Sequence, residues 1–179
     1  AAASRVQAAV SDALDRLVLQ TGPLAMAATS NLQRQLLMNV DGVLRRQTPR
    51  LNQAFARALI ARLQKTFGGR EEGDGTQVRL TRDADWSALT LVDNAEVERG
   101  VHAERLGQSL ASECHEVLAE LDNHLATLLA ANQLERHALR PARLADALLE
   151  AVAEVESDAE VAQLLGHHLG RVLGPLLGP

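Results

Sequence analysis

The sequence predicts an all-α protein, a bundle of about six helices around one long central helix. Leu and Ala must build its core, because 46% of the 179 residues are apolar but only 2% are aromatic. Both residue types favour helices, whereas sheets are rich in β-branched and aromatic residues. Apolar residues also recur every three or four positions over long stretches, which is the period of a helix with one buried side.

Three amphipathic helices are expected before residue 68. The first covers residues 4–19, and Thr21-Gly22-Pro23 is expected to end it, since Gly suits a C-terminal cap and Pro cannot continue a helix. The second covers residues 24–46. Thr48-Pro49 is a start signal, an N-cap followed by Pro at the first helical position, and it predicts a third helix over residues 49–67.

The next stretch, residues 68–85, carries four Gly and several acidic residues but no apolar period. It predicts a mobile Gly-rich and acidic loop, and it is the one place where a subdomain boundary is plausible. We otherwise expect a single helical domain over residues 1–179. The sequence begins with Ala1-Ala2-Ala3 rather than Met and ends with Leu176-Leu177-Gly178-Pro179, so we expect it to be a piece of a longer protein.

The longest apolar stripe follows Asp93, which with Glu96 predicts a capping box at the start of a helix. Its apolar positions alternate by four and three: Leu106, Leu110, Cys114, Val117, Leu121, Leu125 and Leu128. This spacing predicts one uninterrupted helix to about Asn132, against which the others pack. Gly100 and Gly107 inside it cost about 1 kcal/mol each relative to Ala. They mark either a kink or a close approach by a neighbouring helix, and we favour close approach because the apolar stripe resumes in phase after Gly107.

Two further helices are expected in the last forty or so residues. Arg140-Pro141 opens the first, because Pro is favoured at the first helical position, and Leu144, Leu148 and Val152 form its buried side. Ser157 is expected to cap the last helix. Gly174-Pro175 either ends that helix or kinks it.

The net charge of −5 divides unevenly along the chain. Residues 1–70 hold ten Arg or Lys against three Asp, and residues 71–179 hold eight basic against twenty acidic residues, so the two parts carry +7 and −12. A basic part beside an acidic one indicates either a nucleic-acid surface or two parts that complement one another in one fold. We favour the second interpretation, because the basic residues are spaced at helical intervals rather than run together.

Composition also indicates a compartment. The lone Cys114 excludes an internal disulfide and fits a reducing environment. No stretch approaches the ~18 consecutive apolar residues of a membrane span, and no basic-then-apolar leader is visible. We therefore expect a cytoplasmic protein with no membrane partner.

Catalytic and metal-binding patterns are weak. The six histidines are His102, His115, His124, His137, His167 and His168. No two of them have the four-residue spacing that lets two imidazoles share a metal on one helix. Cys114 falls on the apolar stripe, where a thiol acts as a small apolar group, and its neighbour His115 points elsewhere. The Gly-rich stretch 68–75 carries acidic residues that would repel a nucleotide phosphate. We predict no catalytic residue, no metal and no cofactor, and hence no enzyme.

The strongest candidate binding surface is a set of arginines around the Thr48-Pro49 turn: Arg45, Arg46 and Arg50, with Arg34, Arg57 and Lys65 in support. Arginines at a helix–helix corner suit phosphate or an acidic partner. Base-stacking aromatic residues are not interleaved with them, which argues against single-stranded nucleic acid. A solvated corner, or one paired with the acidic part of the same molecule, is the more ordinary interpretation.

Two short stretches carry a resemblance to a known family. The first is Trp86-Ser87-Ala88-Leu89-Thr90-Leu91-Val92-Asp93, followed by the acidic Glu96 and Glu98 and by a Leu-rich segment at residues 121–129. The second is a helix–Arg-rich corner–helix unit that runs from Leu37 through Arg45-Arg46 to Pro49 and on to Phe67. Both resemble a proteobacterial family of large uncharacterised helical proteins, catalogued as a domain of unknown function and often mislabelled as thymidine phosphorylase.

The resemblance extends to Ala138-Leu139-Arg140-Pro141, where the family tends to have Asn-Pro-Leu. The chain departs from the family at Gly100, where a bulkier and often aromatic residue is expected. Membership implies a helical fold and no established activity. The thymidine phosphorylase label does not fit, because the sequence has neither a phosphate-binding loop nor an alternating α/β pattern.

The leading hypothesis is therefore a non-catalytic scaffold or protein-interaction domain, with a protein partner or self-association and a place in a regulatory system. Its basis is that apolar stripes are abundant while convergent polar groups are missing. The alternative is a nucleic-acid-associated regulator that uses the corner of Arg45, Arg46 and Arg50. That alternative requires binding that weakens with salt and with removal of these arginines.

Overall fold

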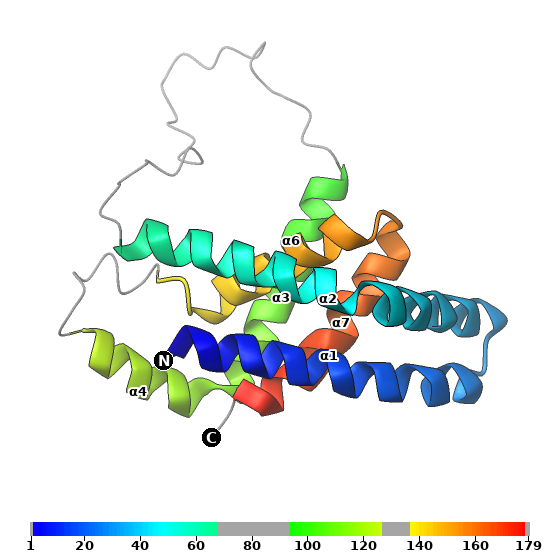
Figure 1. Ribbon diagram of the computed structural model, residues 1–179, viewed down its shortest axis with the longest axis horizontal. Helices are drawn as coiled ribbons and strands as arrows, with labels where there is room; N and C mark the ends of the chain where they lie inside the picture. Colours follow the sequence, from blue (N-terminus) through cyan, green and yellow to red (C-terminus); the bar gives the residue numbers. More distant parts are fainter. Residues whose placement is uncertain (1, 68–93, 127–136, 178–179) are drawn as a thin grey trace, which may run out of the picture.

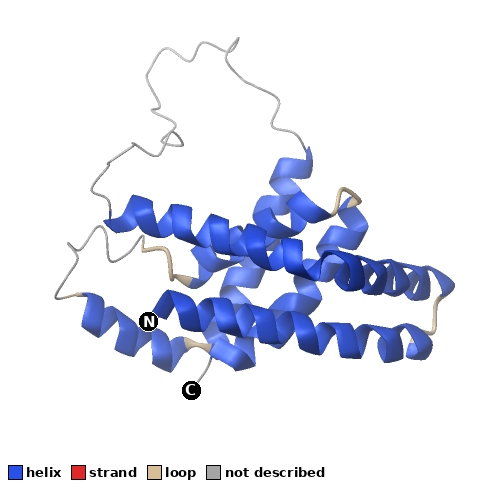
Figure 2. Cartoon of the chain, viewed as in Figure 1, coloured by secondary structure: helices blue, strands red, loops and turns tan. Residues whose placement is uncertain are grey.

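The computed structural model describes residues 2–67, 94–126 and 137–177. Over these ranges the chain forms six α-helices and no strand (Figure 2): α1 (Ala2–Ala27), α2 (Asn31–Phe67), α3 (Asn94–Glu113), α4 (His115–Leu125), α6 (Pro141–Val155) and α7 (Ala159–Leu177). The predicted all-α class and the number of helices are confirmed. The predicted loop at 68–85, the cap at Asp93 and the helix end near Asn132 lie outside the described residues.

The helices pack as a hairpin against a group of three (Figure 1). Helices α1 and α2 run antiparallel, and α3, α6 and α7 lie across one side of this hairpin. The main core draws on all five of these helices, mostly through Leu, Val and Ala. The largest fully buried side chains among the described residues are Phe55, Leu14, Leu17, Leu44, Leu51, Leu110, Leu148, Leu165, Leu169, Leu173, His137 and Val10.

Three prolines lie inside helices that continue past them, so two predicted helix ends are wrong. Helix α1 runs through Pro23, and the two helices predicted over 24–46 and 49–67 are the single α2, which contains Pro49. A proline removes the hydrogen bond to the carbonyl four residues earlier. Pro23 and Pro49 are exposed, and so are Leu19 and Arg45, the residues that carry those carbonyls. Water can therefore replace the lost bonds, while the opposite side of each helix stays packed.

Pro175 in α7 follows the same rule, because it and Arg171 are both exposed. The sequence left open whether Gly174-Pro175 ends or kinks the last helix, and α7 continues to Leu177. At its other end, Asp158 rather than Ser157 is the capping residue. Its Oδ1 accepts the backbone N–H groups of Glu160 at 3.0 Å and Val161 at 3.2 Å. The predicted start at Arg140-Pro141 is confirmed, with Pro at the first helical position of α6.

The predicted central helix is interrupted at Cys114. That residue has φ −110° and ψ 12°, and it separates α3 from α4. Two side chains compete for backbone carbonyls at this point: Ser112 Oγ donates to the Ser109 carbonyl at 2.8 Å, and His115 Nδ1 lies 3.3 Å from the Ser112 carbonyl. The longest helix is instead α2, with 37 residues. Helix α4 has no buried residue, and its apolar side chains are only half-buried.

Glycines set the distances between α3, α6 and α7. A Cβ at Gly107 would lie 3.0 Å from the Cα of Ala142 in α6, which confirms the predicted close approach there. At Gly100, no atom of the described residues outside the helix's own backbone lies within 4 Å of an added Cβ, so no described helix makes the predicted close approach there. In α7, Gly166, Gly170 and Gly174 recur every four residues, and added Cβ atoms would meet side chains of α6 and α3. Glycine thus gives α7 one flat side on which the other two helices rest.

Candidate functional site

The predicted arginines of the Thr48-Pro49 turn lie along one continuous helix, not at a corner. All three are exposed on α2, but they are not equivalent. Arg45 pairs with Asp41 at 2.7 Å. Asp41 also accepts the hydroxyl of the buried Thr21 at 2.8 Å, and the bond from Arg45, helped by that from Thr21, lowers the pKa of Asp41. Arg46 and Arg50 are one turn apart. Binding by this set stays a prediction, now with Arg45 already paired.

Part of the positive charge of α2 is neutralised by ion pairs with α6. Arg57 pairs with Glu154 at 2.5 Å and Arg62 with Glu150 at 2.8 Å, both across the contact between α2 and α6. A third arginine, Arg34, donates to the Ala28 carbonyl at 3.1 Å in the turn of the hairpin. The basic and acidic parts of the sequence therefore meet directly along α2 and α6.

A buried histidine joins α4 to the start of α6. His137 is 1% exposed. Its Nδ1 accepts the Leu139 N–H at 3.2 Å, so its Nε2 carries the proton and donates to Asp122 Oδ1 at 3.1 Å. Arg140 reaches the other oxygen of Asp122 at 3.0 Å. His137 follows Asp122 by fifteen residues in the sequence, and no spacing rule predicts that the two side chains meet. The cluster closes on itself, which fits a structural role.

Three other histidines are also engaged by near neighbours. His102 Nε2 meets the amide nitrogen of Gln163 at 2.5 Å, and His115 and His124 reach backbone carbonyls one turn earlier, His124 at 2.8 Å from the Glu120 carbonyl. Burial, and next the charge of Glu113, raises the pKa of Cys114. Over residues 2–67, 94–126 and 137–177, no three His, Cys, Asp or Glu side chains are grouped as a metal would require.

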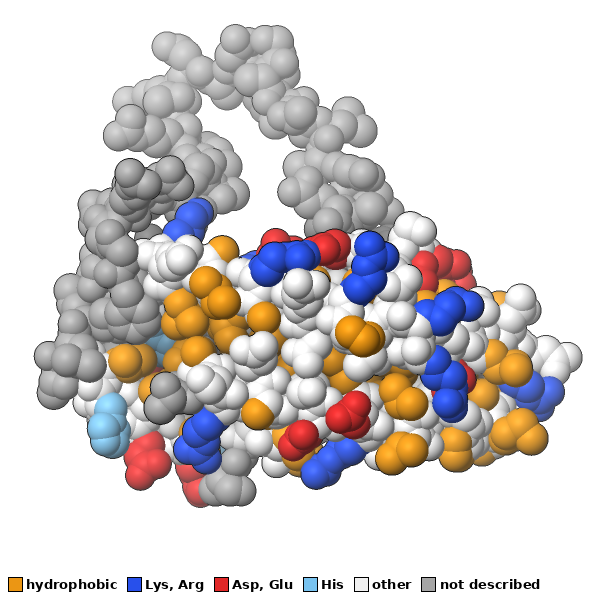
Figure 3. All heavy atoms as spheres, viewed as in Figure 1, with side chains coloured by type: hydrophobic (Ala, Val, Ile, Leu, Met, Phe, Trp, Pro, Cys, Tyr) orange, Lys and Arg blue, Asp and Glu red, His pale blue; other side chains and the backbone are white. Residues whose placement is uncertain are grey.

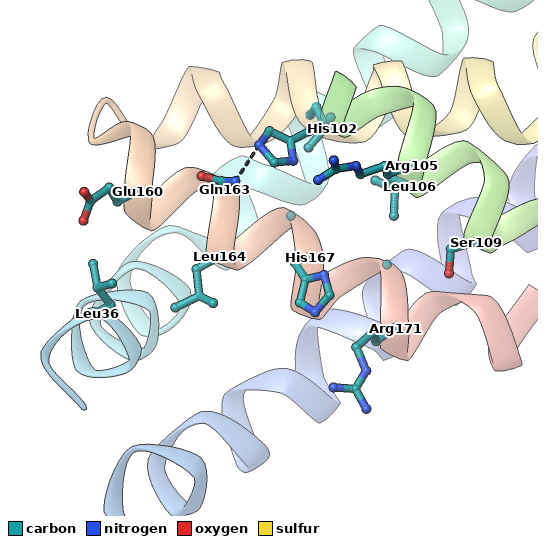
Figure 4. Close-up of a pocket in the computed structure, with 13 residues that line it drawn as sticks. Leu36, His102, Arg105, Leu106, Ser109, Glu160, Gln163, Leu164, His167 and Arg171 are labelled. Atoms are coloured by element: carbon teal, nitrogen blue, oxygen red, sulfur yellow. Dashed lines mark hydrogen bonds between the residues drawn. The ribbon is translucent and has the colours of Figure 1, made fainter. Parts of the chain in front are cut away.

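A cleft of about 670 Å³ opens between α3 and α7 (Figure 4). Its polar lining includes His102 and Arg105 from α3 and His167 and Arg171 from α7, with Glu160 as its one acidic side chain. Its apolar lining is Leu36, Leu106, Leu149 and Leu164, from four different helices. Figure 4 shows Arg105 near His102 on the α3 side, and His167 and Arg171 extending from α7 away from Arg105, with His102 and Gln163 joining the two helices.

The sequence analysis did not find this cleft. A partial signal exists in the spacing, since His102 with Arg105 and His167 with Arg171 each place two basic side chains on one side of a helix. His102 in α3 and Gln163 in α7, which join the two helices, are 61 residues apart in the sequence. The periodicity of each helix does not indicate which other helix it contacts.

Large apolar side chains are exposed at the outer end of the α1–α2 hairpin. We define the hairpin end as the following residues: Leu19, Leu24, Met26, Leu32 and Met38. Leu19 is 76% exposed and Met26 83% exposed. Beneath them lies a small cluster, separate from the main core, of Ala25, Ala28 and Leu37 packed with Leu164. Figure 3 shows apolar side chains gathered along the second half of α1, toward the lower right of the view.

These features define an all-α domain with exposed apolar and basic surfaces. The chain belongs to the family described as "Protein of unknown function (DUF1631) N-terminal domain", whose model matches residues 1–179. This confirms the predicted membership of an uncharacterised family. No curated protein and no solved structure matches the sequence. Among the described helices, none combines the length and the apolar character that a membrane crossing needs.

Proposed function

We propose that this chain is a non-catalytic protein-interaction domain, and that the hairpin end is where its partner binds. The observation that carries the proposal is the exposure of five large apolar side chains at one end of the molecule, led by Leu19 and Met26. Grouped apolar side chains on a surface mark sites of association, because single exposed ones are common but clusters are not.

The outer side of α1 has the spacing of a helix-binding surface. Leu19, Pro23 and Met26 are four and three residues apart and all exposed, so they form one stripe along the solvent side of the helix. The buried Thr21 and Ala25 lie on the opposite side, against α2. Apolar anchors at such intervals are the pattern by which one amphipathic helix packs on another.

Charge indicates the chemistry of the partner. Residues 16–46, which form this half of the hairpin, contain four Arg and one Asp, and no Lys or Glu. Arg45 pairs with that Asp, so Arg16, Arg34 and Arg46 make up the net positive charge. We therefore propose a partner that presents an amphipathic helix with acidic residues beside its apolar side. Complementary charge of this kind favours fast and selective association.

Direct support for a non-catalytic role comes from the polar groups themselves. Buried His137 and its partners Asp122 and Arg140 bond to one another, and His115 and His124 bond to backbone carbonyls. A catalytic acid or base needs a free position within reach of a substrate. These side chains hold helix ends and turns together instead.

The test compares the replacement of exposed apolar side chains by Gln at the hairpin end and at a distant position on α2. Three proteins would be used to capture partners from the cells that make the protein. They are the wild-type chain, the double variant Leu19→Gln with Met26→Gln, and the control variant Ile60→Gln. Ile60 is 51% exposed near the far end of α2, away from the hairpin end. We expect a protein that the wild type and the control retain and the double variant loses, and a Kd for the purified pair that rises at least about tenfold in the double variant.

Two results would overturn this proposal. One is that every captured protein binds the double variant and the control equally. The other is that the wild type captures nucleic acid, released by salt and by Arg45→Glu, Arg46→Glu and Arg50→Glu together, which would favour the nucleic-acid alternative. Light scattering of the purified chain separates a third case, since a dimer lost in the double variant would make a second copy the occupant rather than an acidic partner.

A further inference from the structure

We propose that the cleft between α3 and α7 binds a small organic anion, a phosphate or carboxylate group attached to an apolar body. No residue of the hairpin end and none of Arg45, Arg46 and Arg50 lines the cleft, although Leu164 borders both the cleft and the cluster beneath the hairpin end. Neither the protein-interaction role nor the family description assigns the cleft a ligand. Its volume of about 670 Å³ falls in the range of small-molecule sites.

The charge of the lining favours an anion. Among the described residues, two arginines, two histidines and one glutamate line the cleft. Several arginines of α2 are already in ion pairs: Arg45 with Asp41, Arg57 with Glu154 and Arg62 with Glu150. Arg105 and Arg171 make no ion pair or hydrogen bond with any other described residue. Each guanidinium group is thus available to bind a phosphate or carboxylate group, which this side chain does best.

The same positive field acts on a neighbouring group. His168 follows His167 in α7, and their rings meet edge to face with centroids 5.7 Å apart. Burial lowers the pKa of His168, and the charges of His167 and Arg171 lower it further. The part of this shift that comes from His167 and Arg171 reflects two basic side chains close together on α7, which an anion between them would relieve.

The apolar lining indicates that the ligand carries more than an anionic group. Leu106 is buried and Leu36, Leu149 and Leu164 are half-buried, and all four line the cleft. A bare inorganic anion would leave this surface wet. An aromatic or short aliphatic body would cover it, at about 25 cal/mol for each Å² removed from water.

The walls of the cleft are fixed before any ligand binds. Gly166 and Gly170 lie in its lining, and their lack of a Cβ lets Leu149 and Leu106 pack directly on α7. The bond between His102 and Gln163 closes one end by joining α3 to α7. A site that is already ordered loses little conformational freedom on binding.

A pair of matched probes tests the proposal on the intact chain. Anilinonaphthalene sulfonate is an apolar anion whose fluorescence rises on binding, and phenylnaphthylamine is its neutral counterpart. We expect the anion to bind with a stoichiometry of about one and to be displaced by phenyl phosphate or phenylpropionate but not by benzyl alcohol. Arg105→Gln with Arg171→Gln should raise the Kd of the anion at least about tenfold, the effect of losing one charge-assisted hydrogen bond.

Control variants make the result specific to this cleft. Arg46→Gln with Arg50→Gln removes the same charge from α2, and Leu19→Gln with Met26→Gln removes apolar surface from the hairpin end. Both should leave the Kd of the anion within about twofold of wild type. The neutral probe should bind the Arg105 and Arg171 variant as it binds wild type, and thermal unfolding should show that this variant is folded. Equal loss of the anion in an Arg46 and Arg50 variant, or binding of both probes with the same Kd, would overturn the proposal.

Discussion

At the junction of α3, α6 and α7, glycines let helices approach closely, whereas at the hairpin end large apolar side chains stay in solvent. In the junction, Gly107 meets the backbone of Ala142, and Gly170 receives the side chain of Leu106. At the hairpin end, a thin cluster of Ala25, Ala28 and Leu37 supports the two helices. The two regions thus treat apolar surface differently: the junction buries it, and the hairpin end leaves it in solvent, where the proposed partner would bind.

The largest expected contrast is between a buried and an exposed apolar side chain. Leu169 in the junction is 0% exposed, and Leu169→Ala should lower the free energy of unfolding by about 2–5 kcal/mol through lost burial and the cavity left behind. Met26→Ala at the hairpin end should change it by no more than about 0.5 kcal/mol. Urea denaturation of both variants measures the two values. A loss above about 2 kcal/mol for Met26→Ala would mean that the hairpin end is part of the core.

A second contrast lies within α3, where two glycines have opposite surroundings. Gly107→Leu should cost about 1–3 kcal/mol, because the new side chain would have to displace the backbone of α6. Gly100→Leu should instead stabilise the chain by up to about 1 kcal/mol, because its surroundings are open and Leu is a better helix former than Gly. Thermal unfolding of the two variants measures the sign of each effect. Equal effects would remove the basis for a close α3–α6 contact.

Periodicity in the sequence was enough to predict the fold class, and specific elements show where it stops. The apolar stripes of Leu14, Leu44 and Leu148 identify helices because burial repeats with the turn of the helix. Pro23 and Pro49 misled the prediction, because the rule that proline ends a helix ignores which side faces water. Whether the lost hydrogen bond can be replaced depends on the tertiary packing, which local sequence does not contain.

The candidate sites depend even more on tertiary structure. Arg45, Arg46 and Arg50 were found because they are close in sequence, yet the corner expected there lies within the continuous helix α2. The cleft joins Arg105 to Arg171 across two helices, and no local pattern pairs them. The glycine spacing of four at Gly166, Gly170 and Gly174 was the available signal that α7 is a closely packed helix.

A third contrast extends to α4, which has no buried residue of its own. Asp122 holds α4 to the start of α6 by accepting bonds from His137 and Arg140. Asp122→Ala should cost about 1–3 kcal/mol, because the buried N–H of His137 loses its partner. The control Asp146→Ala removes a surface pair with Arg143 at 3.9 Å and should cost less than about 0.5 kcal/mol. Similar values for both variants in urea denaturation would show that the cluster contributes nothing beyond a surface pair.

The smallest expected effect is a pH dependence that belongs to the junction. His168 is half-buried in α7, and its pKa is lowered from 6.5, first by burial and then by the charges of His167 and Arg171. Below about pH 6.5 the unfolded imidazole therefore takes up a proton that the folded one does not, and the free energy of unfolding falls as pH drops through this range. His168→Gln should flatten the loss between pH 6.5 and the lower folded pKa and have little effect at pH 8. If His168→Gln kept the wild-type dependence of the free energy of unfolding on pH in urea denaturation, the lowered pKa of His168 would make no contribution to stability.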